Sequence, residues 1–325
     1  MERILALVVS HNRHQSLVEC IEAIRRQTVQ PEAILVVNND SADYTSVWLD
    51  QQEDIIHLYQ KNTGSAGGFA AGLEWAHKYG FTWIWCMDDD GYAKEDALEK
   101  LLSQRLTQPI LINSLVVNKD DKQTLVWNTN GYTKLDDINE EVLDGIAHPF
   151  NGSLIHRKVV EIAGLPNRNL FCRGDEAEYF YRITRRHRIK AVTVTSSIYY
   201  HPSKKFSYSK EWKLDTSWST YYHVRNQLAI LTSKYNNRIL AFFAYLLFMM
   251  RFTTGIIRQQ RTQRAGKLAF VFRASTDALL GNYAVTPQTI IHKIKNQYTA
   301  PVKNMLIVSC KNALSAWFLP EMAEA

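Results

Sequence analysis

The sequence predicts an α/β fold in which a mostly parallel sheet is flanked by helices and followed by a basic helical C-terminal region. Three observations predict it. Apolar, β-branched segments alternate with segments of helical spacing over residues 1–107, and polar residues follow each apolar segment. Beyond about residue 216 the chain becomes helical and basic, so we place a domain boundary there.

The first 107 residues alternate between strands and helices. Strands are expected at 4–10, 33–40, 55–60 and 81–87, and helices at 16–28, 67–80 and 95–106. The fourth strand is apolar throughout, as expected where helices cover both faces of a parallel sheet. Ligands collect at the carboxyl ends of such strands, so the polar residues there should line one crevice.

Length and composition indicate a protein with a large core. A chain of 325 residues with 46% hydrophobic content holds either one domain with an appendage or two domains. The four cysteines form no CxxC pair, which predicts neither a zinc site nor a disulfide framework and fits a reducing cytoplasm. The N-terminal apolar segment reads as a buried strand rather than a signal peptide.

Three consecutive carboxylates, Asp88, Asp89 and Asp90, end the fourth strand. Such a triplet requires solvation by water or neutralisation by a cation. Alternate residues of an extended segment point the same way, so Asp88 and Asp90 should converge while Asp89 points elsewhere. Oxygen ligands suit Mg²⁺ or Mn²⁺. The alternative is a solvated acidic turn before Gly91.

Two further segments could carry chemistry. Residues 60–73 form a glycine-rich loop that leads into a helix and either presents N–H groups to an anion or allows close packing. Asp175 and Glu176 stand at a predicted helix start, where a carboxylate is either a cap or a base. His201 ends a later strand and, taken alone, is more often structural.

The order of these motifs resembles the GT-A-fold, family 2 inverting glycosyltransferases, which use nucleotide-sugar donors. SHNR, NNDSAD, NTGSAGGFAAGL, DDDG, DEAE and HP follow one another over residues 1–230. The glycine segment with DDDG is similar to the galactofuranosyltransferase and rhamnosyltransferase branch, and there is no QxxRW motif. The resemblance implies a Rossmann-like nucleotide-diphospho-sugar transferase domain over 1–215, with a donor half to about 107 and an acceptor half from 108.

The resemblance also implies roles for individual residues. Asp88, Asp90 and His201 would hold a divalent metal, Mn²⁺ or Mg²⁺. Asp175 would be the general base, with Glu176 as the other candidate, because relatives often carry an aromatic residue and two aspartates where this chain has Gly174, Asp175 and Glu176. The implied donor-binding residues are Ser10, Asn12, Arg13, Asp40, Asn62, Gly67, Gly68, Asp88, Asp89 and Arg225. The implied acceptor-binding residues are Asn151, Gly152 and Ser153.

The expected function is metal-dependent, inverting transfer of galactofuranose from UDP-galactofuranose to a polysaccharide or lipid-linked glycan of the cell envelope, such as an O-antigen. A dTDP-rhamnose-dependent rhamnosyltransferase is the next alternative. A nucleotidyltransferase would carry a glycine-rich, basic signature after the first strand, which SHNRHQSL lacks. A non-catalytic, membrane-associated nucleotide-sugar-binding protein would not need the intact acidic residues.

The C-terminal region differs in charge from the rest of the chain. Residues 201–325 hold 17 Lys and Arg against 5 Asp and Glu, a net +12; since the whole chain carries +6, the first 200 residues carry −6. Residues 218–274 hold no acidic residue, which predicts contact with an anionic membrane surface, peripheral to the inner face of the cell membrane. The alternative for 239–250 is a core or homo-oligomer interface helix. Because this apolar run is only about 12 residues long, we expect no membrane span. Nucleic acid is not an expected partner.

Overall fold

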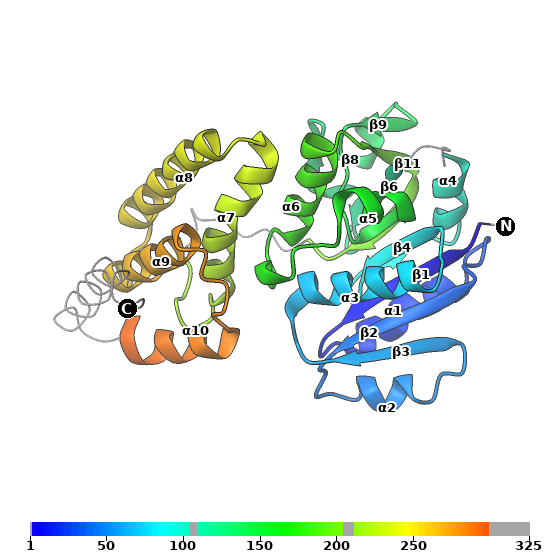
Figure 1. The fold of residues 1–325 in the computed structure, drawn as a ribbon, viewed down its shortest axis with the longest axis horizontal. Helices are drawn as coiled ribbons and strands as arrows, with labels where there is room; N and C mark the ends of the chain where they lie inside the picture. Colours follow the sequence, from blue (N-terminus) through cyan, green and yellow to red (C-terminus); the bar gives the residue numbers. More distant parts are fainter. Residues whose placement is uncertain (1, 105–108, 204–210, 299–325) are drawn as a thin grey trace, which may run out of the picture. The chain divides into compact units, whose positions relative to one another are not determined.

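The computed structural model describes residues 2–104, 109–203 and 211–298 and divides the chain into two compact units (Figure 1). The first unit comprises Met1–Lys205 and Ser233–Asn236, and the second Phe206–Thr232 and Asn237–Ala325. The boundary predicted at 215/216 falls near the start of the second unit. Residues 105–106 of a predicted helix and residues 299–325 of the basic region, with Cys310, lie outside the described residues.

A mixed sheet forms the centre of the first unit. Its strand order is β3-β2-β1-β4-β10-β6-β11-β5, with β7 beside β6, β8 beside β7 and β9 beside β11. The bounds are β1 Ile4–Ser10, β2 Ala33–Asn39, β3 Ile55–Gln60, β4 Trp83–Asp88, β5 Tyr92–Ala93, β6 Ile110–Asn118, β7 Thr124–Thr129, β8 Tyr132–Lys134, β9 Val142–Asp144, β10 Asn151–His156 and β11 Lys190–His201.

The sheet is parallel only in part. Strands β3, β2, β1 and β4 run parallel to one another, as the sequence predicts. Strand β10 then enters antiparallel between β4 and β6, while β11 runs parallel to β6. The predicted α/β fold is confirmed, and the sheet is mixed because β10 reverses the strand direction beside β4.

Helices cover both faces of this sheet, which is why β1 and β4 are apolar along almost their whole length. Alternate residues of β1 enter opposite cores: Ala6 and Val8 pack with residues of α1 and α4, and Leu7 and Val9 with residues of α3, α5 and α6. The helices of this unit are α1 His14–Arg25, α2 Thr45–Leu49, α3 Gly64–Lys78, α4 Ala97–Ser103, α5 Arg157–Ala163 and α6 Asp175–Tyr181.

Helix α3 lies close against β1 because two of its four glycines face that strand. A Cβ atom at Gly68 would overlap the side chain of Val9, and one at Gly72 would overlap Leu7. Packing alone therefore accounts for a glycine at position 68, which favours the close-packing interpretation of the glycine-rich segment over a ligand contact there.

Helices make up the described part of the second unit. They are α7 Ser219–Tyr235, whose last three residues belong to the first unit, α8 Arg238–Gln259, α9 Arg264–Leu279 and α10 Pro287–Lys293.

Helix α8 is longer than the apolar run of about 12 residues that the sequence indicated. It has 22 residues and is apolar and long enough to cross a membrane by length and composition, a test that a core helix also meets. The expectation that no stretch reaches that length is corrected: the helix continues past Arg251 because Phe252 and Ile256 extend its apolar face.

Candidate active site

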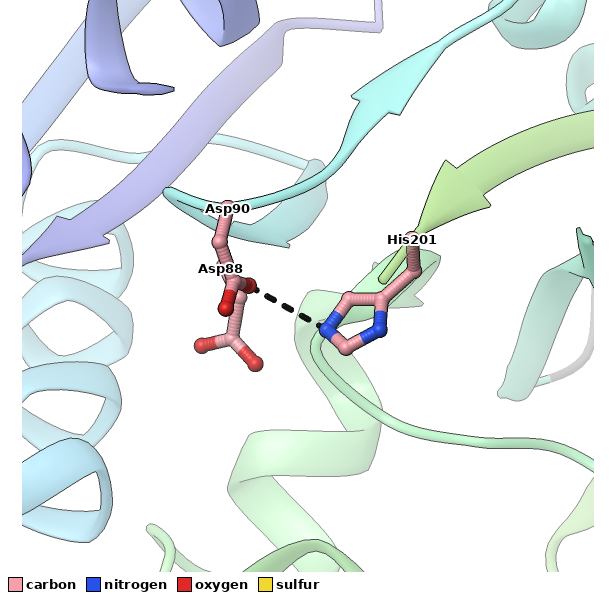
Figure 2. A group of neighbouring side chains, drawn as sticks. All are labelled: Asp88, Asp90 and His201. Atoms are coloured by element: carbon pink, nitrogen blue, oxygen red, sulfur yellow. Dashed lines mark ion pairs between the residues drawn. The ribbon is translucent and has the colours of Figure 1, made fainter. Parts of the chain in front are cut away.

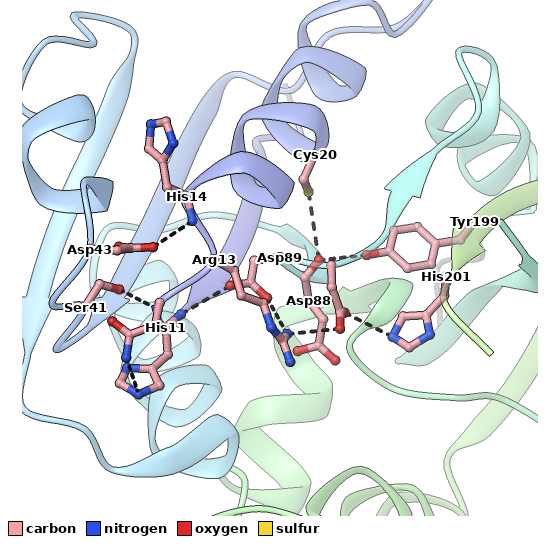
Figure 3. Close-up of polar contacts among 12 residues, drawn as sticks. His11, Arg13, His14, Cys20, Ser41, Asp43, Asp88, Asp89, Tyr199 and His201 are labelled. Atoms are coloured by element: carbon pink, nitrogen blue, oxygen red, sulfur yellow. Dashed lines mark hydrogen bonds and ion pairs between the residues drawn. The ribbon is translucent and has the colours of Figure 1, made fainter. Parts of the chain in front are cut away.

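The parallel strands end together at one edge of the sheet. In the register of these strands, Ser10 of β1 lies beside Asn38 of β2, and Asp88 of β4 lies beside Val9 of β1. The chain leaves β1 and β2 through residues with left-handed backbone, Asn12 and Asp40. The polar residues after these strands therefore lie along one edge of the sheet, as expected at the carboxyl edge of an open sheet (Figure 3).

Asp88, Asp90 and His201 form a group that could hold a metal ion. One ligand atom from each of these half-buried side chains lies within 4.8 Å of the other two (Figure 2). Nε2 of His201 lies 3.2 Å from Oδ1 of Asp90. The predicted convergence of Asp88 and Asp90 is thus present in the structure, and His201 completes a set of two carboxylates and one imidazole.

The hydrogen bonding of His201 suits a cation between these groups. Its Nδ1 lies 2.9 Å from the carbonyl oxygen of Pro202. A carbonyl can only accept, so Nδ1 carries the hydrogen and Nε2 is the nitrogen that faces Asp90, where a metal ion would take its lone pair. A lone pair and a carboxylate oxygen repel each other unless a proton or a metal ion lies between them. The donor set therefore fits a divalent cation.

A short strand explains how residues 111 positions apart meet. Directly after the acidic triplet, β5 pairs antiparallel with the end of β11, so that Ala93 lies beside Tyr199. The hydroxyl of Tyr199 also donates a 2.9 Å hydrogen bond to the carbonyl oxygen of Asp88. A Cβ atom at Gly91 would overlap the Tyr199 ring, so the glycine after the triplet permits this approach.

Asp89 points away from the metal-binding group and pairs with protein groups. Its carboxylate accepts a 2.7 Å hydrogen bond from Nη1 of Arg13 and a 3.2 Å bond from the backbone N–H of His11 (Figure 3). Arg13 also lies 3.0 Å from Oδ2 of Asp90. A single arginine thus compensates Asp89 and part of Asp90.

The remaining negative charge falls on Asp88. Burial raises the pKa of Asp88 well above its ordinary value, and the nearby carboxylates of Asp90 and Asp89 raise it further. Burial also raises the pKa of Asp89, although Arg13 acts in the opposite direction. A divalent ion at Asp88 and Asp90 would instead favour the charged carboxylates.

His11, which the sequence did not single out, organises the loop after β1. Its Nδ1 lies 2.8 Å from the carbonyl oxygen of Asn39 and therefore donates to it. Nε2 then accepts from the side-chain amides of Asn12 and Asn62, each at 3.1 Å. Two of the predicted donor-binding residues, from different loops, thus meet at one imidazole. The stretch SHNR was recognised, but nothing in it distinguished His11.

The other predicted donor-binding residues of this edge lie in different environments. Ser10 is buried, with 1% exposure. Asp40 is exposed and accepts a 2.5 Å hydrogen bond from the hydroxyl of Tyr59, which is itself 56% exposed. Asp40 therefore presents its carboxylate at the surface of the edge, where a ligand can reach it.

The N–H groups of the glycine-rich loop are already used within the protein. The N–H groups of Thr63 and Gly64 donate to the side chains of Asn39 and Asn62, and that of Ala66 donates to the carbonyl oxygen of Phe171. At Gly67, a Cβ atom would overlap Thr63. Three of the backbone N–H groups that an anion would need are therefore already hydrogen-bonded within the protein, so the loop acts here as a structural turn.

Asp175 begins α6 and is 2% exposed. Oδ2 of its carboxylate accepts a 2.9 Å hydrogen bond from the hydroxyl of Ser65, at the start of α3. Burial raises the pKa of Asp175 well above its ordinary value; Glu176 raises it further, and Ser65 lowers it. The charge of Glu176 also raises the pKa of Asp88, so Glu176 lies close enough to interact electrostatically with the metal-binding group. Ser65 is a second residue that sequence reasoning missed, because it lies 110 positions from Asp175.

The predicted acceptor-binding residues belong to the sheet interior. Asn151 and Ser153 begin β10 and are 4% and 0% exposed. The hydroxyl of Ser153 accepts a hydrogen bond from the backbone N–H of Phe150, and the carbonyl oxygen of Gly152 accepts one from Ser114. Ser153 therefore has no exposed atom for a ligand in this structure, and the role of this segment in acceptor binding stays a prediction.

Arg225 is part of the second unit and is completely buried. Its guanidinium lies 4.7 Å from the ring centre of Tyr222 and 5.0 Å from that of Tyr283, and its Nε donates to Asn226. These contacts place it within the helical unit, so its role in donor binding stays a prediction.

Aromatic side chains lie next to His201, and sequence reasoning missed them as well. The ring of Trp127 in β7 lies 5.6 Å from that of His201 and stacks on His148 at 4.7 Å. Burial lowers the pKa of His148 to about 4, so this ring is neutral near pH 7. The metal-binding group is therefore bordered on one side by the uncharged aromatic rings of Trp127 and His148.

An α/β sheet with two carboxylates and a histidine at its carboxyl edge, and a buried carboxylate nearby, is typical of enzymes that act on phosphorylated or nucleotide-linked substrates. The family model described as glycosyl transferase family 2 matches residues 6–161. The chain is also 32% identical over 215 residues to galactofuranosyltransferase GlfT1 of Mycobacterium tuberculosis strain H37Rv, covering 62% of this chain and 70% of that protein. It is 34% identical over 217 residues to GlfT1 of Mycolicibacterium smegmatis, covering 62% and 71%.

The chain belongs to glycosyl transferase family 2 and is a glycosyltransferase. Solved structures agree on the fold. TarS residues 1–349 of S. aureus superpose with a TM-score of 0.52 at 11% identity, covering 99% of this chain and 94% of that chain. The mannosyltransferase PcManGT of Pyrobaculum calidifontis, in complex with GDP-Man and Mn²⁺, gives 0.50 at 13% identity, covering 97% and 81%. The predicted GT-A fold and family are therefore confirmed.

Proposed function

We propose that this glycosyltransferase transfers galactofuranose from UDP-galactofuranose to a polysaccharide or lipid-linked glycan, with inversion at the anomeric carbon. The likeness to the GlfT1 galactofuranosyltransferases, at 32–34% identity over some 215 residues, supports the choice of sugar. The convergence of Asp88, Asp90 and His201 at the carboxyl edge is the observation that carries the proposal, because a diphosphate leaving group needs charge compensation at such a point.

Asp88, Asp90 and His201 are the proposed ligands of Mn²⁺ or Mg²⁺. Two carboxylates and an imidazole suit either ion, and the Nδ1 hydrogen bond to Pro202 leaves Nε2 of His201 free to coordinate. When bound, such an ion supplies Lewis-acid stabilisation of the charge on the leaving diphosphate. Mn²⁺ accompanies GDP-Man in the structure of the mannosyltransferase PcManGT, which shares the fold.

The nucleoside is proposed to lie over the ends of β1 and β2. Asn12 and Asn62 meet at His11, and Asp40 presents an exposed carboxylate that can accept hydrogen bonds from ribose hydroxyls. Arg13 lies between this surface and the acidic triplet, where it compensates Asp89 and Asp90. Its position suits contact with the donor diphosphate as well.

Asp175 is the proposed general base. A base must accept the proton of the acceptor hydroxyl as that oxygen attacks the anomeric carbon, and a pKa raised by burial and by Glu176 makes Asp175 a stronger base than an ordinary aspartate. The hydrogen bond from Ser65 fixes one carboxylate oxygen. One displacement with one base inverts the anomeric centre. Glu176 is the competing base, since it follows Asp175 directly.

A transfer assay tests this function. The purified chain is incubated with Mn²⁺, a panel of synthetic octyl glycosides as acceptors, and either UDP-galactofuranose or dTDP-rhamnose; nucleotide release is measured, and the product linkage is read by NMR. Release of UDP with an inverted galactofuranosyl product is expected. Turnover with dTDP-rhamnose alone would replace the sugar assignment. Turnover of neither donor with any acceptor, in a protein that is folded, would contradict the proposal.

A further inference from the structure

Helix α8 exposes an apolar face that no requirement of the catalytic site explains. The helix has 22 residues, and only 28% of its most apolar window is buried. Six large apolar side chains along it are more than half exposed: Ile239, Leu240, Phe243, Leu247, Met250 and Ile257. Ile239, Phe243, Leu247 and Met250 are three or four residues apart. Leu240 is next to Ile239, and Ile257 lies two turns beyond Met250, so the six side chains form one continuous face. Exposed apolar surface of this extent marks an interaction site.

The opposite face of α8 packs within the second unit. Ala241, Tyr245, Met249, Phe252 and Ile256 are buried and share one side of the helix. The hydroxyl of Tyr245 donates a hydrogen bond to the carbonyl oxygen of Val224 in α7. A helix that spanned a bilayer would have to separate from these contacts. The packing therefore favours a helix that lies along a surface, with one face on the protein and the other on its partner.

Basic residues border the apolar face. Arg251 and Arg258 are exposed and directly follow Met250 and Ile257, and Arg238 begins the helix. Arg261 and Arg264, just beyond its end, are exposed as well. Residues 218–274 contain no acidic side chain. Glu211, the acidic residue nearest the end of α8 among those that the structure pairs there, is itself neutralised by Lys267 and accepts from the backbone N–H of Arg261. An apolar face with a cationic border is complementary to anionic lipid headgroups over acyl chains.

We propose that α8 binds in the plane of an anionic lipid bilayer, with Phe243, Leu247 and Met250 inserted at the headgroup level and Arg251 and Arg258 on the headgroups. A helix of 22 residues is about 33 Å long. Lying parallel to the surface, it would contact the bilayer over that whole length, which is close to the thickness of a bilayer core. This surface is independent of the donor sugar, and it goes beyond the proposed function.

Vesicle flotation with the full chain tests the proposal. Wild type should float with vesicles of phosphatidylcholine and phosphatidylglycerol, and should bind vesicles of phosphatidylcholine alone much more weakly; added salt should weaken the binding. Phe243→Glu with Leu247→Glu should lower the affinity by at least about 100-fold, because both charges would enter the apolar contact. Arg251→Gln with Arg258→Gln should lower it roughly 30-fold.

A matched control separates this face from general charge effects. Val47→Glu with Ile162→Glu adds the same two charges at exposed apolar positions of the first unit, 49% and 47% exposed, and should leave vesicle binding unchanged. Circular dichroism melting establishes that each variant is folded. Equal binding by wild type and the Phe243/Leu247 variant would overturn the proposal. The proposal would also fail if wild type did not bind anionic vesicles but formed an oligomer that the Phe243/Leu247 variant dissociates. It would fail as well if wild type resisted carbonate extraction from membranes, as a protein with a spanning helix does.

Discussion

The two sides of the acidic triplet differ in how their charge is compensated. Asp89 is 2% exposed and is held by Arg13 and the backbone of His11. Asp88 and Asp90 are half-buried and face His201, whose Nε2 lies 3.2 Å from Oδ1 of Asp90. Asp89 is thus neutralised within the protein, whereas Asp88 and Asp90 share only part of the charge of Arg13 and form a group that could hold a metal ion. A run of three identical residues can therefore divide into a structural half, Asp89, and a half suited to a ligand, Asp88 and Asp90.

The largest expected effect concerns Asp175, a buried carboxylate outside the triplet. Asp175→Asn keeps the shape and the hydrogen bond from Ser65 but cannot accept a proton, so the transfer rate should fall about 1,000-fold. Binding of UDP, measured by calorimetry, should change little. Glu176→Gln is the matched control and should retain most of the rate. The reverse pattern would make Glu176 the base.

The next effect breaks the cation-binding half. Asp88→Asn should weaken Mn²⁺-dependent binding of UDP by about 100-fold, because a ligand of the ion is lost. Without metal, the same variant should melt roughly 2–4 °C higher than wild type, since repulsion among buried carboxylates is relieved. Calorimetry and thermal unfolding in EDTA measure the two quantities. A variant that melts lower than wild type in EDTA would contradict the account of Asp88.

A smaller effect tests the structural half. Arg13→Gln should lower the free energy of unfolding by about 1–2 kcal/mol in EDTA, because Asp89 loses its charged partner while it stays buried. Arg13 is 47% exposed at its side chain, which limits the loss. Denaturant unfolding measures it, and Arg26→Gln, at an exposed arginine of the same unit, serves as the control. An unchanged unfolding free energy would show that Asp89 does not need Arg13.

The smallest effect is a shift in pH dependence. The hydrogen bond from Ser65 lowers the pKa of Asp175, so Ser65→Ala should raise that pKa beyond its already raised value. Asp175 acts as a base only when deprotonated; transfer therefore falls as the pH drops through this pKa, and the acid limb of kcat/KM should move to higher pH in the variant. Rates well above the limb should stay close to wild type. Ser65→Thr, which keeps the hydroxyl, should restore the limb, and an acid limb that does not move in Ser65→Ala would remove Ser65 from this role.

Sequence patterns predicted the features that depend on neighbouring residues. Four parallel strands, the polar residues at their ends and the divergence of Asp89 from Asp88 and Asp90 all follow from periods of two and 3.6 residues. The resemblance to a known family added His201, which its position alone did not distinguish. The structure brings His201 to the triplet through the pairing of β5 with β11.

Features that depend on distant pairing could not be predicted. Ser65 and Asp175 lie 110 positions apart, and His11 contacts Asn39 at the end of β2 and Asn62 in the loop after β3. The antiparallel entry of β10 carries no local signal either, since its apolar residues suit both directions. The length of α8 was underestimated because Arg251 interrupts the apolar run but not the helical face.

Calorimetric titration of UDP tests whether donor binding requires a cation at Asp88 and Asp90. Wild type is titrated with Mn²⁺ and again with EDTA, beside Asp88→Ala with Asp90→Ala and, as a matched control, Asp89→Asn. We expect that wild type binds UDP only with Mn²⁺, that the double variant does not bind it, and that folded Asp89→Asn binds it as wild type does. Equal binding of UDP with Mn²⁺ and with EDTA in wild type would contradict this expectation and would return Asp88 and Asp90 to a solvated acidic turn.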